Sequence, residues 1–136
     1  FYFQHTVQQL PNGNIILFDN GGGENLGVLR PVEFGSFSRG LELELDLNNM
    51  TAKKVWEYRH DPDHISSTIS SVQRLDNGNT LVNFGRRPVT LVEADEDGNL
   101  VWSLVNESLT YMLRYRAQVI KSIGGEQPTT APKSEN

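Results

Sequence analysis

Residues 7–14, Val-Gln-Gln-Leu-Pro-Asn-Gly-Asn, return 65 positions later (72 − 7) as residues 72–79, Val-Gln-Arg-Leu-Asp-Asn-Gly-Asn. A second match joins residues 55–58, Val-Trp-Glu-Tyr, to residues 101–104, Val-Trp-Ser-Leu, at a spacing of 46 (101 − 55). The longer connection 19–39 in the first copy absorbs most of the difference. Each copy therefore has the same order of strand, Asn-Gly turn, strand, loop, strand, turn and strand, which indicates two similar units placed side by side.

The stretches between the turns have the patterns of β-strands. Asn12-Gly13 and Asn77-Gly78 accept the positive φ angles of a tight hairpin turn. Residues 41–45 alternate Leu and Glu, as in a strand with one buried face, whereas residues 15–18 are all apolar, as in a strand buried on both faces. We predict little helix before Ser108 and eight strands, near residues 4–10, 14–19, 41–47, 53–59, 69–75, 79–84, 89–95 and 99–105.

These features predict an all-β protein with two four-stranded antiparallel blades of the β-propeller type, because self-similar meanders favour blades over a sandwich. Propellers commonly have about 4–8 blades, and two blades cannot close a ring. We therefore expect the chain to be part of a propeller that the remaining blades or other protein chains complete. The predicted parts are a first blade with a long loop (1–66), a second blade (67–106), a terminal strand or short closing segment (107–123) and a disordered tail (124–136).

Composition and charge exclude several classes of protein. The net charge of −5 and the pI near 5.1 argue against a nucleic-acid partner, because phosphate binding needs clustered Lys and Arg. No apolar run approaches the roughly 20 residues that span a bilayer. The chain has no cysteine, so disulfides and thiolate metal sites are not available. The aromatic start, Phe-Tyr-Phe, is typical of a strand entered midway, so we expect the natural polypeptide to extend upstream.

Two stretches carry a resemblance to a known family. The first is residues 4–6, Gln-His-Thr, followed by residues 10–21, Leu-Pro-Asn-Gly-Asn-Ile-Ile-Leu-Phe-Asp-Asn-Gly. The second is residues 37–39, Phe-Ser-Arg, which lead into the two strands expected at 43–46 and 55–58. Over these stretches the chain resembles the aryl-sulfate sulfotransferase family. The resemblance implies a periplasmic or secreted six-bladed propeller that moves a sulfuryl group between phenols through a sulfated histidine, without a nucleotide donor.

The resemblance also implies two site residues. His5 matches the family's Gln-His histidine, a donor or proton carrier at the sulfuryl group, and Arg39 matches the Ser-Arg arginine that binds sulfate oxygens. An arginine presents a planar fork of donors to such an anion, and an imidazole can protonate a leaving phenolate near neutral pH. The family's nucleophilic histidine is expected after residues 83–85, and Thr90 lies near that position here. A threonine without an adjacent base is a poor sulfuryl carrier, so we do not expect the chain alone to be active.

Both site residues also have a purely structural interpretation. His5 could be a hydrogen-bonded strand histidine, and Arg39 could pair with Glu42 or Glu44 on an exposed face. The segment 60–64, His-Asp-Pro-Asp-His, has the composition of a metal site, but its proline indicates a turn. We expect a solvated loop there, with no bound metal and no cofactor.

Three functions stay open from the sequence. The first is an arylsulfotransferase-like segment that acts on an aryl sulfate or binds another small anion. The second is a non-catalytic secreted propeller module that acts in binding or structural assembly. The third is a bulb-lectin-type sugar binder, because residues 76–82 resemble that repeat. Two glycosylation triplets, at Asn49 and Asn106, fall in predicted turns and favour export from the cytoplasm.

Overall fold

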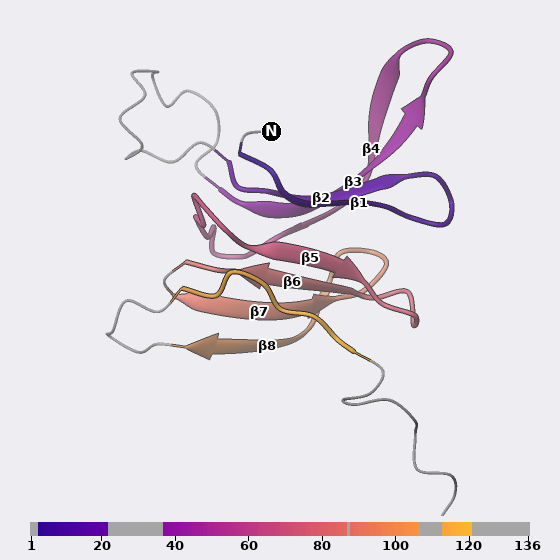
Figure 1. The fold of residues 1–136 in the computed structure, drawn as a ribbon. Coiled ribbons are helices and arrows are strands. Elements are labelled where there is room, and N and C mark those ends of the chain that lie inside the picture. The colour runs from indigo at the N-terminus through magenta and orange to yellow at the C-terminus, as the bar shows by residue number, and fades with distance from the viewer. Residues whose placement is uncertain (1–2, 22–36, 87, 107–112, 121–136) are drawn as a thin grey trace, which may run out of the picture.

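The computed structural model describes residues 3–21, 37–86, 88–106 and 113–120. Within these ranges the protein has no helix, and none of this part of the chain could cross a membrane as a helix. Figure 1 shows the eight strands: β1 (His5–Gln9), β2 (Ile15–Asp19), β3 (Arg39–Asp46), β4 (Thr51–Arg59), β5 (Ser71–Arg74), β6 (Thr80–Phe84), β7 (Val89–Ala94) and β8 (Leu100–Asn106).

The strands form two four-stranded antiparallel sheets, in the orders β1-β2-β3-β4 and β5-β6-β7-β8. Each strand pairs with its neighbour in sequence, so each sheet is a simple meander. The prediction of an all-β chain with two blade-like sheets is therefore confirmed, and each predicted strand overlaps an observed one. The six-bladed ring and the assigned parts of the chain stay predictions, and the expected tail at 124–136 lies outside the described residues.

The matching turns of the two sheets have the same geometry. Gly13 and Gly78 have φ angles of 90° and 89°, which glycine adopts without steric cost. In the first turn the Asn12 side chain accepts a hydrogen bond from the backbone N–H of Asn14, and in the second Asn77 accepts one from Asn79, at 3.0 and 3.1 Å. The sequence match at a spacing of 65 therefore corresponds to a match in local structure.

The two sheets stack face to face on a shared apolar core (Figure 1). Cross-strand partners point to the same face of a sheet, so the pairs Ile16–Glu42 and Phe18–Gly40 define the face of the first sheet that meets the second. The Phe18 and Phe84 rings meet edge to face, with their centroids 5.3 Å apart. The buried cluster is Leu10, Ile16, Phe18, Trp56, Tyr58, Val72, Val82, Phe84, Val92 and Ala94.

The described residues cover the outer face of the second sheet only in part. Trp56 in β4 is 7% exposed, as expected of a residue that packs between blades, whereas its sequence counterpart Trp102 in β8 is 41% exposed. An irregular segment, residues 113–120, lies along this sheet (Figure 1). It is held at β5, where Ser71 Oγ accepts from the N–H of Ala117 at 3.1 Å. The two sheets therefore share one topology but have different surroundings.

Candidate functional site

The two predicted site residues lie at the same end of the first sheet. Strand β1 begins at His5 and β3 begins at Arg39, while β2 ends at Asp19 and β4 ends at Arg59. Because neighbouring strands are antiparallel, these four termini lie at the same end of the sheet. The fold therefore brings His5 and Arg39 to a common end of the sheet, although 34 positions (39 − 5) separate them in the sequence.

The register places the two side chains on different faces of that end. Arg39 pairs with Asp19, and His5 pairs with Phe18, the preceding residue of β2. Successive residues of a strand point to opposite faces, and Phe18 points into the core between the sheets. A ligand that contacts both His5 and Arg39 would therefore have to lie across the end of the sheet.

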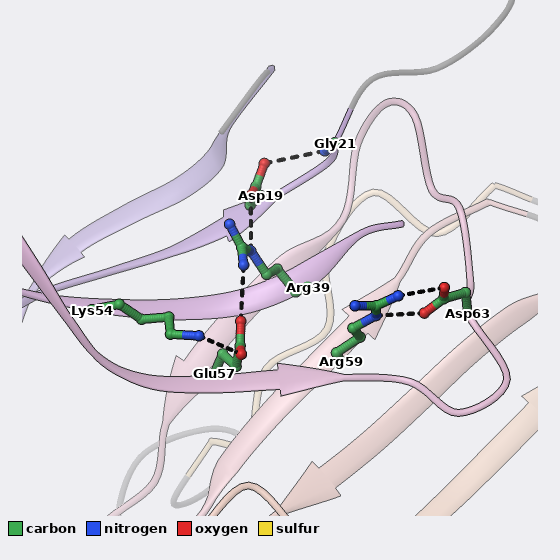
Figure 2. A network of polar contacts seen from close by, with 7 residues as sticks. All are labelled: Asp19, Gly21, Arg39, Lys54, Glu57, Arg59 and Asp63. Carbon is green, nitrogen blue, oxygen red and sulfur yellow. Dashed lines mark hydrogen bonds and ion pairs between the residues drawn. The ribbon is translucent and has the colours of Figure 1, made fainter. Parts of the chain in front are cut away.

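Arg39 is held by carboxylates on both neighbouring strands (Figure 2). Its Nε donates to Asp19 Oδ2 at 3.0 Å, and its Nη1 donates to Glu57 Oε2 at 2.8 Å. The Asp19 side chain is buried, and its other oxygen accepts the N–H of Gly21 at 3.1 Å. The expectation that Arg39 pairs with Glu42 or Glu44 is wrong, because the cross-strand register puts Asp19 and Glu57 beside it instead.

Glu57 completes a chain of alternating charges. Its Oε1 accepts from Lys54 Nζ at 2.5 Å, so the network runs from Asp19 through Arg39 and Glu57 to Lys54 (Figure 2). Partial burial acts to raise the pKa of Glu57, but the hydrogen bonds from Lys54 and Arg39 outweigh it, and the pKa lies below its ordinary value. Glu57 therefore stays ionised at neutral pH and competes with any anion for the guanidinium of Arg39.

A second arginine lies beside this network. Arg59 makes a bidentate ion pair with Asp63, in which both N–O distances are 2.6 Å (Figure 2). Its guanidinium carbon lies 3.7 Å from the centre of the Phe37 ring, while that of Arg39 lies 5.4 Å from the same ring. Hydrogen bonds from Arg59 lower the pKa of Asp63, so this pair also stays charged. Sequence reasoning missed it, because the turn after β4 that brings Asp63 back to Arg59 has no pairing signature in the sequence.

The imidazole of His5 is held through one nitrogen. Nδ1 lies 2.6 Å from Asn20 Oδ1 and 2.9 Å from the carbonyl oxygen of Phe3. The Asn20 amide is oriented by its own contacts, because Nδ2 donates to the carbonyls of Ser66 and Ile69 at 2.5 and 2.8 Å. Oδ1 must then face His5, and an oxygen acceptor requires a hydrogen on Nδ1. The neutral imidazole consequently carries its lone pair on Nε2.

Asn20 also ties the end of the first sheet to the connection between the sheets. Its backbone oxygen accepts from Ser38 Oγ at 2.6 Å, and that hydroxyl accepts the N–H of Ser66 at 2.8 Å. Asn20, Ser38 and Ser66 are all fully buried. The sequence pointed to the Asp-Asn-Gly motif at 19–21 only through the family resemblance, and the structure shows what the asparagine of that motif does.

Two other residues with side chains that could carry a sulfuryl group, Thr90 and His64, are buried. Thr90 is buried within β7, and its hydroxyl donates to the carbonyl of Pro88 at 3.2 Å. His64 is 8% exposed and packs against Phe84 with ring centroids 4.9 Å apart, so the prediction of a solvated loop is wrong at this residue. Burial lowers the pKa of His64 and outweighs a hydrogen bond to the Arg86 backbone. His64 thus turns inward and packs its ring on the aromatic core, while residues 61–63 stay exposed.

The described residues contain no group of three or more His, Asp or Glu side chains that could hold a metal ion. His60 and His64 lie with ring centroids 6.0 Å apart, and Asp63 of the same loop is engaged by Arg59. The expectation of a site without metal or cofactor stays a prediction.

Comparison with known proteins gives the family. The model of the arylsulfotransferase (ASST) family matches residues 1–101. The arylsulfate sulfotransferase AssT of Escherichia coli O6:H1 (strain CFT073) is 32% identical over 86 residues, which are 62% of this chain and 14% of that protein. The chain thus spans about a seventh of the length of this relative. The matched region includes His5, Asn20, Arg39 and Glu57. The chain belongs to the arylsulfotransferase (ASST) family.

Proposed function

We propose that this chain is a segment of an extracytoplasmic arylsulfotransferase-type propeller, in which His5 and Arg39 form part of a site for an aryl sulfate or a similar small anion. The observation that carries this proposal is the imidazole of His5, which Asn20 orients through Nδ1. A side chain held in this way keeps one nitrogen for proton exchange at a defined position.

The chemistry of sulfuryl transfer suits this arrangement. When the S–O bond of an aryl sulfate breaks, the phenolate that leaves takes up a proton, and the acceptor phenol loses one. Nε2 of His5 is the nitrogen that would give and take this proton, because Nδ1 is engaged by Asn20 and Phe3. Such general acid–base catalysis is typically worth about 10²–10⁴-fold in rate. His5 is thus proposed as the proton carrier of the site.

Arg39 is proposed to hold the sulfate oxygens, at the expense of one of its present ion pairs. The Asp19 side chain is buried, whereas that of Glu57 is about one-third exposed, so Glu57 is the partner that an anion would displace. This competition predicts weak anion binding by the chain alone. The remaining blades would strengthen it by adding donors.

Two observations favour a second function: Thr90 is buried, and the charge of Arg39 is already compensated by its ion pairs with Asp19 and Glu57. The threonine near the expected position of the nucleophile is buried and hydrogen-bonded inside β7, where it cannot meet a substrate. We therefore propose that the segment does not transfer sulfuryl groups by itself. If it binds no aryl sulfate either, a non-catalytic module for binding or assembly is the better description.

Export from the cytoplasm is part of the same proposal. Asn49 lies in the exposed turn between β3 and β4, and its side chain donates to Asp46 Oδ2 at 2.7 Å. The triplet Asn49-Met50-Thr51 is therefore accessible to a glycosyltransferase. An attached glycan at Asn49 in the native protein, detected by peptide mass spectrometry, would place the chain in a secretory compartment.

Titration calorimetry with 4-nitrophenyl sulfate tests the binding site. We expect saturable binding that His5→Ala and Arg39→Ala each weaken by about ten- to a hundred-fold, since a charge-assisted contact is worth roughly 1.5–3 kcal/mol. Arg59→Ala is the matched control, because Arg59 lies at the same edge but is paired with Asp63. If all three variants weakened binding of 4-nitrophenyl sulfate equally, the loss would follow from a general change in the chain rather than from particular contacts. That result would contradict the proposed site.

A further inference from the structure

The two sheets carry the same acceptor carboxylate, and among the described residues one of the two copies is paired with a basic side chain of the neighbouring sheet. In the first sheet, Glu42 Oε1 accepts from the side chains of Asn12 and Asn14, at 3.5 and 2.7 Å. In the second sheet, Glu93 Oε1 accepts from Asn77 and Asn79, at 3.4 and 2.6 Å.

The register confirms that these two acceptors are equivalent. Glu42 pairs with Ile16 on one side and with Trp56 on the other, and Glu93 pairs with Leu81 and Trp102 in the same way. In each case the carboxylate is flanked by an aliphatic residue and a tryptophan on the same face of the sheet.

The acceptor of the first sheet, Glu42, forms an ion pair with a basic side chain of the second sheet. Arg74 of β5 donates to Glu42 Oε2 at 2.5 Å, and its guanidinium carbon lies 5.0 Å from the centre of the Trp56 ring. Trp56 Nε1 in turn donates to the carbonyl of Asp95 at 3.1 Å. A basic side chain on the first strand of the following unit thus closes the contact between the sheets.

The acceptor of the second sheet has no basic partner among the described residues. Glu93 Oε2 accepts instead from Trp102 Nε1 of its own sheet, at 2.5 Å. A cavity of about 360 Å³ lies beside it, lined by Gln73, Arg74, Leu75, Asp76, Asn77, Glu93 and Val119. The site keeps a carboxylate, two asparagine side chains and an exposed tryptophan together, with room for a further side chain.

The segment 113–120 lies where a following first strand would lie. Thr6 Oγ1 of the first sheet donates to the carbonyl of Ser70, and the matching residue of the second sheet, Ser71, contacts the backbone of Ala117. Two residues further along, the Gln73 side chain binds the backbone of Val119 through both its oxygen and its nitrogen. Ala117 therefore takes the place of Ser70, at a spacing of 47 (117 − 70).

At the same spacing of 47 (121 − 74), Lys121 is the counterpart of Arg74 in the sequence. Lys121 directly follows the last described residue. We propose that the segment beginning at Lys121 docks on the outer face of the second sheet, with the Lys121 ammonium between Glu93 and Trp102. Charge complementarity supports this occupant, because the acceptor is anionic and the matching position in sequence is basic. Val119 supports it too, because it lines the cavity beside Glu93 two residues before Lys121.

Zero-length carbodiimide cross-linking of the full chain tests the proposal, because the reagent joins only an amine and a carboxylate in direct contact. We expect a Lys121–Glu93 cross-linked peptide in the mass spectrum, lost in Glu93→Gln. Lys133, in the same terminal stretch, is the matched control and should give no Glu93 product. Arg74→Lys is the positive control, since the side chain at position 74 should then react with Glu42.

Mixing unlabelled with nitrogen-15-labelled chains separates this occupant from a second copy. Single-label Lys121–Glu93 peptides support docking within one chain. Mixed-label peptides would overturn it, because Glu93 would then be filled by another molecule. The proposal also fails if Lys121 reacts with carboxylates at large and Glu93→Gln leaves its products unchanged.

Discussion

Replacing Asn20 by alanine tests the most connected polar residue of the site. Its side chain is fully buried and makes three contacts, to His5 and to the carbonyls of Ser66 and Ile69. Alanine removes the donor of both carbonyls. The end of the first sheet would then keep only the hydrogen bonds through Ser38 among the contacts described above to the connection between the sheets.

The size of the effect follows from the two carbonyls. A buried group that loses its hydrogen-bond partner costs about 1–3 kcal/mol, so Asn20→Ala should lower the free energy of unfolding by roughly 2–5 kcal/mol. A chain of this size commonly has about 7–15 kcal/mol in total. Asn12→Ala, at the exposed turn of the same sheet, removes a 3.5 Å contact to Glu42 and the exposed hydrogen bond from the N–H of Asn14, and should cost about 1 kcal/mol.

Urea denaturation followed by circular dichroism measures both variants. We expect the midpoint to fall clearly for Asn20→Ala and little for Asn12→Ala, with an unchanged dependence on urea. Equal, small losses in the two variants would refute the reasoning, because they would mean that Asn20 does not anchor the connection. A change in the urea dependence would instead point to partial unfolding of that connection.

Three further predictions concern the core, its titration and the ion pairs. Trp56→Ala should cost about 3–5 kcal/mol of unfolding free energy and Trp102→Ala much less, because only Trp56 is buried between the sheets; thermal unfolding of both variants decides this. The buried His64 has a lowered pKa, so the folded state binds fewer protons than the unfolded one, and stability should be full above the ordinary value of 6.5 and fall as the pH drops below it. This slope should disappear in His64→Gln and persist in His60→Gln. Arg39→Gln should destabilise the chain more than Arg59→Gln, because Asp19 is buried while Asp63 is half-exposed; a pair of denaturation curves that coincide would contradict this.

The architecture could be predicted from the sequence because its signals are local. The Asn-Gly turns fix where the hairpins reverse. The expectation that the Leu face of residues 41–45 is the buried one is wrong, because Glu42 is buried on the same face as the core residues Ile16 and Trp56, whereas Leu45 is 41% exposed. The two matched stretches then give the same meander twice. The different exposure of Trp56 and Trp102 could not be foreseen, since it depends on whether a neighbouring unit packs on each sheet.

The site was harder to predict because its contacts join residues far apart in sequence. Arg39 pairs with Asp19 across an interval of 20 residues, and only the register of β2 with β3 selects that partner over the nearby Glu42. Asn20 binds backbone carbonyls, which have no residue-type signature at all. His64 was expected in solvent because its neighbours in sequence are charged, but its ring is apolar enough when neutral to pack on Phe84.

We propose that the segment presents His5 and Arg39 to an anion and does not itself supply the histidine that carries the sulfuryl group. The most direct measurement incubates the purified chain with 4-nitrophenyl sulfate and a phenol acceptor, follows release of the chromophore, and searches the digested protein for a sulfated histidine. We predict binding of the aryl sulfate, no turnover and no sulfated peptide. Turnover with the sulfuryl group trapped on His60 or His64 would contradict this proposal, because it would place the nucleophile at a residue to which we assign no role in the transfer.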